Sequence, residues 1–101
     1  MTQLQSVQAW SDEKLDEEIL EITDRMASPT QSLEDSLEVQ AKAIERKPRE
    51  YAENLIRVVN GDFPLYQLKE NYIFNLHYLN QLLQATPRQR AEATYLTIKA
   101  V

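Results

Sequence analysis

Apolar residues recur at helical spacing along most of the chain, and the stretch from Pro64 to Ala85 is the longest one without a helix breaker. It carries two apolar stripes on different sides of the expected helix. The main stripe contains Leu65, Leu68, Tyr72, Leu76, Leu79 and Leu83, and the second stripe contains Phe74, Tyr78 and Leu82. Because a helix that is apolar on two sides is usually covered on two sides, we predict that residues 64–85 form the central helix.

Four other segments show helical stripes of their own. They begin near Ser11, Ser28, Pro48 and Thr86, where a hydroxyl side chain or a proline suits the start of a helix. The residues expected to face inward on the second of these helices are Leu33, Leu37, Ala41 and Ile44. No segment alternates between apolar and polar residues as a half-buried strand does. The pattern therefore predicts an all-α fold, a compact bundle of about five helices.

Two further features help to define where helices begin and how deeply they are buried. Residues 28–31 and 86–89 share the pattern of a hydroxyl residue, proline, any residue and glutamine, which is typical of a capping box with proline at the first helical position. The helix that begins at Pro48 has apolar residues over an arc of roughly 160°, which is too wide for a helix at the surface. We therefore expect this helix to be deeply buried.

The two ends of the chain differ in their patterns. The first nine residues have no clear period, so we expect residues 1–9 to be a flexible tail and residues 10–101 to form a single helical domain. The features of a signal peptide are missing, and no apolar run is long enough to span a bilayer. The absence of cysteine excludes disulfides and thiolate metal sites. We therefore expect a cytoplasmic protein that does not enter a membrane.

The net charge of −5 is unevenly distributed, because residues 11–38 hold ten acidic and two basic residues. Four of these acids share one helix face: Glu13, Glu17, Glu21 and Asp24. The simplest interpretation is a solvated outer face. The sharper interpretation is an acidic decoy that blocks a nucleic-acid-binding protein by imitating its ligand.

Residues that could support catalysis are scarce. His77 is the only histidine, and Phe74 stands three residues before it, where a di-iron bundle places a glutamate. The chain has one glycine, too few for a phosphate-binding loop, and it has no Gly-x-Ser-x-Gly motif. We therefore expect no catalytic residues, no metal site and no cofactor, and we predict that the protein is not an enzyme.

Basic residues raise the alternative of a nucleic-acid-binding regulator. Three of them surround Pro48 and two begin the last helix: Arg46, Lys47, Arg49, Arg88 and Arg90. Residues 39–101 hold nine basic and six acidic residues, an excess that is small for a phosphate-binding surface. This alternative therefore has weak support, but it remains open.

The second stripe of residues 64–85 is the strongest candidate for a binding surface, because aromatic side chains give large contact areas and polar residues usually surround such a patch. The predicted partner-binding residues are Phe74, Tyr78 and Leu82, with Asn71 and Asn75 at the rim. We therefore expect a protein-binding module without enzymatic activity, such as a small adaptor, inhibitor or assembly factor. Its partner is another protein or a second copy of the chain. The alternative is that the last helix covers this stripe within the same molecule.

Overall fold

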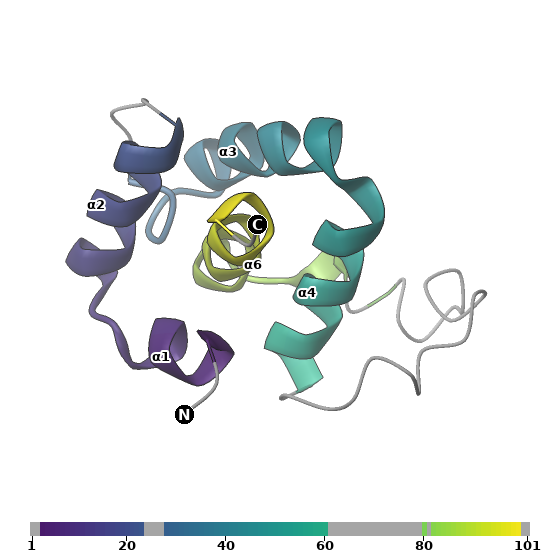
Figure 1. The fold of residues 1–101 in the computed structure, drawn as a ribbon, viewed down its shortest axis with the longest axis horizontal. Coiled ribbons are helices and arrows are strands. Elements are labelled where there is room, and N and C mark those ends of the chain that lie inside the picture. The colour runs from purple at the N-terminus through teal and green to yellow at the C-terminus, as the bar shows by residue number, and fades with distance from the viewer. Residues whose placement is uncertain (1–2, 24–27, 61–79, 81, 100–101) are drawn as a thin grey trace.

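The computed structural model describes residues 3–23, 28–60, 80 and 82–99, and within these ranges the chain forms helices and no strands (Figure 1). The helices are α1 (Gln3–Ala9), α2 (Asp12–Thr23), α3 (Leu33–Arg46), α4 (Pro48–Asn60) and α6 (Pro87–Lys99). Asn80 and residues 82–84 are also helical. The predicted all-α class is therefore confirmed. In this described part of the chain, no helix is both long and apolar enough to cross a bilayer.

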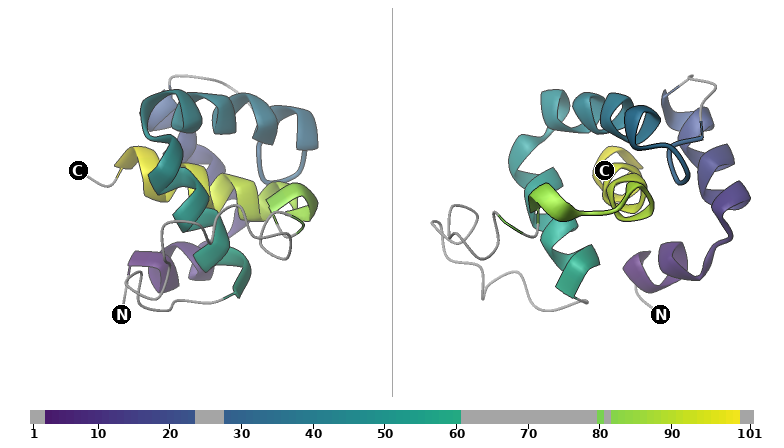
Figure 2. Two further views of the ribbon diagram at one scale, coloured as in Figure 1. Left: turned by 90° about the vertical axis from the view of Figure 1, so that its right-hand side faces the viewer. Right: turned by 180° about the vertical axis from the view of Figure 1, so that it is seen from behind.

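Helix α6 lies at the centre of the fold, and α1, α2, α3 and α4 surround it (Figures 1 and 2). Every residue of α6 from Arg90 to Thr97 is buried. The sequence pattern had favoured residues 64–85 for the central position, which α6 occupies instead; residues 64–79 and 81 lie outside the described residues. Half of the buried run of α6 is polar, so its apolar pattern is too weak to indicate a central helix.

Helix α1 belongs to the core, and the prediction that the N-terminus forms a flexible tail is wrong for residues 3–9. Leu4 and Val7 are only 3% and 1% exposed. Trp10, which follows α1, packs edge-to-face on Tyr95 of α6, with ring centroids 5.1 Å apart. Two apolar residues three positions apart are too few to reveal a helical period, which explains why the sequence pattern missed this helix.

The expected helix starts at Ser11 and Thr86 are confirmed. The Lys14 N–H donates to Ser11 Oγ at the start of α2 (3.1 Å). At the start of α6 the Gln89 N–H donates to Thr86 Oγ1 (3.1 Å), and the Thr86 N–H donates to Gln89 Oε1 (2.9 Å). These two reciprocal bonds are the predicted capping box.

The capping box predicted for residues 28–31 is wrong, because the N-cap of α3 is Ser32 and the preceding residues form a turn. The Ser32 side chain accepts the Asp35 N–H (3.2 Å). Thr30 instead bonds to α2: its N–H and its hydroxyl donate to the two carboxylate oxygens of Asp16 (3.1 and 3.0 Å). These bonds fix the turn before α3 to α2.

The apolar face of helix α4 is largely buried, in agreement with its wide apolar arc. Tyr51, Leu55, Ile56 and Val58 are all at most 6% exposed. Lys47 ends α3 with φ −147° and ψ 72°, and its carbonyl accepts the Tyr51 N–H in the first turn of α4 (3.0 Å). One residue thus redirects the chain so that α3 and α4 cover two sides of α6 (Figure 2).

Candidate partner-binding surface

Helix α3 turns its large apolar side chains toward solvent. Leu33, Leu37 and Ile44 are 51%, 41% and 41% exposed, and Ala41 is exposed as well. The prediction that these four residues face inward is therefore wrong. The buried residues of α3 are instead Ser36, Val39 and Ala43. Because these side chains are small, they let α3 approach α6 closely, since the distance between packed helices depends on the residues at the contact.

The outer surface of α3 has an apolar part and an acidic part. The α3 stripe consists of Leu33, Leu37 and Ile44. Their side chains fall within an arc of about 40°, at 100° per residue. The acidic rim consists of Glu34, Glu38 and Glu45, which are exposed and follow the stripe on the side remote from the buried face.

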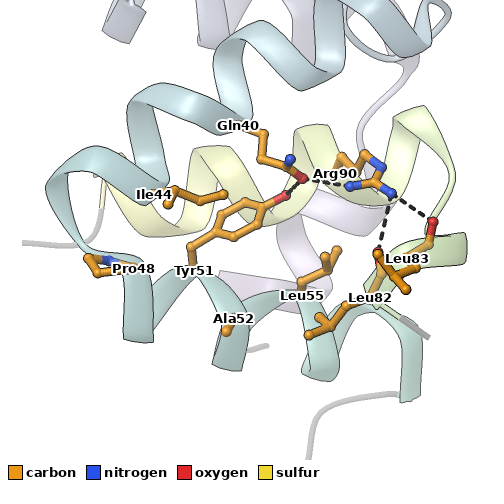
Figure 3. A pocket seen from close by; sticks show the side chains of 9 residues that line it. All are labelled: Gln40, Ile44, Pro48, Tyr51, Ala52, Leu55, Leu82, Leu83 and Arg90. Atoms are coloured by element: carbon orange, nitrogen blue, oxygen red, sulfur yellow. Dashed lines mark hydrogen bonds between the residues drawn. The ribbon is translucent and has the colours of Figure 1, made fainter. Parts of the chain in front are cut away.

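An apolar cavity of about 260 Å³ adjoins the C-terminal end of the α3 stripe (Figure 3). Ile44 belongs to both the stripe and the cavity wall. Tyr51 and Leu55 of α4 line it from below, and Leu82 and Leu83 line the side across from Ile44. Leu83 is 70% exposed. The stripe and the cavity therefore meet at Ile44.

Three polar side chains fix the wall of the cavity. Gln40 Oε1 accepts a hydrogen bond from the Tyr51 hydroxyl (2.5 Å) and another from Arg90 Nη1 (2.7 Å). Arg90 also donates from Nη2 to the carbonyls of Leu82 and Leu83 (3.2 and 3.1 Å) (Figure 3). Its Nε donates to the carbonyl of Ala85 (3.1 Å). A guanidinium at the carbonyl end of a helical turn satisfies carbonyls that have no partner within the helix. Arg90 is therefore a structural residue that holds residues 82–85 against α6.

The Tyr51 hydroxyl stays protonated over the physiological range. Burial raises its pKa far above the ordinary value for tyrosine, and the neighbouring Arg90 charge and Thr94 hydroxyl offset this only in part. The Thr94 hydroxyl is itself buried and forms no hydrogen bond of good geometry. Tyr51 thus acts as a neutral hydrogen-bond donor to Gln40.

The partner-binding residues predicted from the sequence are described only in part. Leu82 is half-buried, packs against the core and lines the cavity. The other predicted residues, Phe74, Tyr78, Asn71 and Asn75, lie outside the described residues, as does His77. Leu82 therefore links the predicted stripe to the surface of α3, which the sequence pattern did not indicate as a binding site. The interruption of the apolar face of α3 by Gln40 was the available signal.

The basic residues of the nucleic-acid alternative do not form one open surface. Arg88 donates from Nη2 to the carbonyls of Val7 and Trp10 (3.0 and 2.9 Å), from Nη1 to Asp12 (2.7 Å), and from Nε to Glu92 (2.6 Å). Burial lowers the pKa of Arg88, but the bonds to Glu92 and Asp12 raise it more, so the net shift is upward. Arg88 therefore joins α6 to the connection between α1 and α2.

Of the remaining bases, Arg46, Lys47 and Arg49 lie at the corner between α3 and α4, and Arg90 lies on α6. Arg90 is buried, Arg49 forms an ion pair with Glu53 (3.0 Å), and Arg46 is exposed. Lys47 is half-buried at the junction between the two helices. Three of the five predicted phosphate-binding residues, Arg49, Arg88 and Arg90, are thus engaged by groups of the protein itself.

The acidic face of α2 is exposed where the structure describes it. Glu13, Glu17 and Glu21 are solvent-facing, and Asp24 lies outside the described residues. Among the residues that are described, no group of three or more histidine, cysteine, aspartate or glutamate side chains could hold a metal ion. Comparison of the chain with protein-family models, curated proteins and solved structures finds no match.

Proposed function

We propose that this protein is a binding module without enzymatic activity, a small adaptor, inhibitor or assembly factor that holds a partner protein on the α3 stripe and the adjoining cavity. The observation that supports this most is the exposure of three large apolar side chains on one face of α3. Single exposed apolar residues are normal on protein surfaces, whereas contiguous patches mark interaction sites. The cavity and the exposed Leu83 extend this patch beyond α3.

The apolar area is large enough to contribute to binding. Complete burial of a leucine or isoleucine side chain is worth about 1.5–3 kcal/mol. Leu33, Leu37 and Ile44 are already about half-covered, so a partner gains roughly 1 kcal/mol from each. Leu83 is 70% exposed, so its burial by a partner contributes more binding free energy than burial of any one of these three residues. The patch therefore supplies a core of apolar contacts, around which polar contacts can set specificity.

The chemistry of the cavity favours binding over catalysis. Its ionisable lining residues are Tyr51 and Arg90, and both are fixed in the hydrogen-bond network with Gln40. A general acid or base needs a pKa near the working pH, and the pKa of Tyr51 is moved away from it. The nucleic-acid alternative is less well supported, because Arg88 and Arg90 bind backbone carbonyls.

The surface predicted from the second stripe can be tested beside this one. If Phe74 and Tyr78 continue the apolar surface beyond Leu82, the Tyr78→Asp variant should weaken binding while the chain stays folded. Unfolding of that variant would instead place Tyr78 in the core, and the two results are distinguished by far-UV circular dichroism.

Site-specific photo-crosslinking in the cells that produce the protein tests the proposed function. Benzoylphenylalanine at position 37 lies on the α3 stripe, and at position 17 it lies on the exposed acidic face of α2. We expect a discrete protein adduct from position 37 and none of the same mass from position 17. Introducing Ile44→Asp should abolish that adduct without unfolding the chain, because Ile44 is 41% exposed. Equal adducts from both positions, or an adduct that survives Ile44→Asp, would refute the proposal.

A further inference from the structure

The spacing of the α3 stripe suits packing against another helix. Leu33, Leu37, Gln40 and Ile44 follow one another at intervals of four, three and four residues. This alternation is the a and d spacing of a coiled coil, in which side chains of one helix enter the gaps of the next. The span from Leu33 to Ile44 is about 17 Å, at 1.5 Å per residue, which matches three turns of a partner helix.

Gln40 is a polar residue within the span of the α3 stripe, and its side chain is held by hydrogen bonds. Its Oε1 accepts hydrogen bonds from both Tyr51 and Arg90, and these two bonds hold the side chain in place. A single polar residue in an apolar seam commonly fixes the register of two helices. The cavity beside it is the next specific feature, because an apolar cavity of about 150 Å³ is enough to hold benzene. At about 260 Å³ it can receive one large apolar or aromatic side chain.

The charges beside the stripe select the partner. Glu34, Glu38 and Glu45 all lie on its solvent side. The bases of α3, Lys42 and Arg46, lie beyond these glutamates, further from the stripe. A partner helix on the stripe therefore meets a row of carboxylates along one edge. A basic flank forms ion pairs with Glu34 and Glu45 of this row, and the net charge of −5 adds attraction at longer range.

A second copy of the chain fits this surface less well than a basic partner. In a twofold-symmetric pair the same patch is used on both molecules, so the same glutamates would approach each other. Like charges at such spacing are destabilising. The charge pattern thus argues against pairing of two α3 stripes.

We propose that the α3 stripe binds an amphipathic helix of another protein, with a basic flank facing the acidic rim and a large apolar side chain entering the cavity. This inference rests on the proposed function and specifies its partner. The recognition mode is that of a helix laid along an apolar groove, where residues at intervals of three and four provide the anchors.

Three labelled synthetic helical peptides test this inference with the full chain. They share one apolar face with a terminal phenylalanine and differ only in the flanking residues, which are lysine, glutamine or glutamate. Measured by fluorescence anisotropy at low salt, the affinity should be highest for the lysine peptide, lower for the glutamine peptide and lowest for the glutamate peptide. Each exposed ion pair contributes up to about fivefold in affinity, so we expect the lysine peptide to bind on the order of tenfold more tightly than the glutamine peptide. Added salt should reduce this difference.

Two variants and one control peptide separate the contributions. Leu37→Asp should abolish binding of all three peptides, and the Glu34→Gln, Glu45→Gln double variant should remove the preference for lysine while the glutamine peptide binds as before. All three positions are exposed, so both variants should keep the helical circular dichroism of the parent. A scrambled lysine peptide without an apolar face should not bind.

The possible failures are distinguishable. Equal affinity for the three peptides would overturn the basic-flank inference, and binding that survives Leu37→Asp would overturn the site itself. If no peptide binds although position 37 crosslinks to a partner, the helical-partner inference fails and the proposed function stands. A mass in solution of twice the monomer that returns to the monomer in Leu37→Asp would show that a second copy is the occupant, and would also overturn the inference.

Discussion

Two arginine–glutamate pairs with identical sequence spacing allow a sharp test of the fold. Arg49 and Glu53 on α4 form an ion pair of 3.0 Å, with side chains 55% and 16% exposed. Arg88 and Glu92 on α6 form one of 2.6 Å, with side chains 22% and 7% exposed. Arg88 also binds two backbone carbonyls at the end of α1. We predict that Arg88→Met destabilises the protein far more than Arg49→Met.

The expected losses in the free energy of unfolding follow from the burial of the two ion pairs. An exposed helical ion pair is worth about 0–1 kcal/mol, so Arg49→Met should stay within that range. Hydrogen bonds to charged groups contribute about 1.5–3 kcal/mol each, and Arg88→Met loses two of them to carbonyls. It also leaves the Glu92 carboxylate buried without its ion-pair partner, which adds a desolvation cost. With a discount for the remaining exposure of Arg88, we expect a loss of about 3–4 kcal/mol.

Urea unfolding at neutral pH, followed by circular dichroism and by the fluorescence of the single tryptophan, measures both variants. Trp10 packs on α6, so its fluorescence reports the same contact that Arg88 supports. Adding Glu92→Gln to Arg88→Met should recover about 1–2 kcal/mol, because the buried charge is removed. If Arg88→Met costs no more than Arg49→Met, the structural role assigned to Arg88 is wrong.

Three further predictions concern the core and its ionisation. Leu55→Ala should lower the free energy of unfolding by roughly 2–5 kcal/mol, whereas Leu83→Ala should change it by less than about 0.5 kcal/mol, because the first residue is 2% and the second 70% exposed. Equal losses in urea titrations would contradict this. Tyr51 has a raised pKa in the folded state, so its contribution to stability should be complete below about pH 10 and should fall as the pH rises further; Tyr51→Phe should reduce this loss in alkaline titrations followed by circular dichroism. Val7→Asp should unfold α1 and destabilise the chain, while Gln3→Asp on the exposed side should not. Equal thermal unfolding temperatures for the two variants would show that α1 is dispensable.

Local capping chemistry was predictable only where no better partner competed. Residues 86–89 form the expected box because Thr86 and Gln89 bind each other. In the similar residues 28–31, Thr30 binds Asp16, which is fourteen positions away in sequence. The Ser28 N–H donates instead to Asp35 (3.1 Å). A contact between this turn and α2 therefore replaced the local one, and a sequence pattern does not contain that information.

The central position of α6 was hidden for a related reason. Arg90 is satisfied by Gln40, which lies fifty positions earlier, and the Thr97 hydroxyl accepts a hydrogen bond from Asn54 on α4 (3.0 Å). Buried polar groups of this kind are stable only because distant residues pair with them. By contrast, the wide apolar arc of α4 needed no distant partner, and its burial was predicted correctly.

The candidate surface was missed because α3 has two faces that could meet the core. The face with Leu33, Leu37 and Ile44 has the larger apolar side chains, and periodicity alone favours it. The structure buries Ser36, Val39 and Ala43 instead. A sequence pattern gives the spacing of a face, but the choice between a large and a small face depends on the shape of the helix that packs against it.

The identity of the three exposed residues on α3 is difficult to explain by folding alone. Lysine, glutamine and glutamate have helix propensities close to that of leucine, so any of them at positions 33 and 37 would support the helix equally well. At position 44 each of them is a better helix former than isoleucine. Polar residues would also avoid the association that exposed apolar patches promote. About half of each side chain of Leu33, Leu37 and Ile44 remains exposed in the isolated chain, and the partner surface that we propose would account for the apolar character of these three residues.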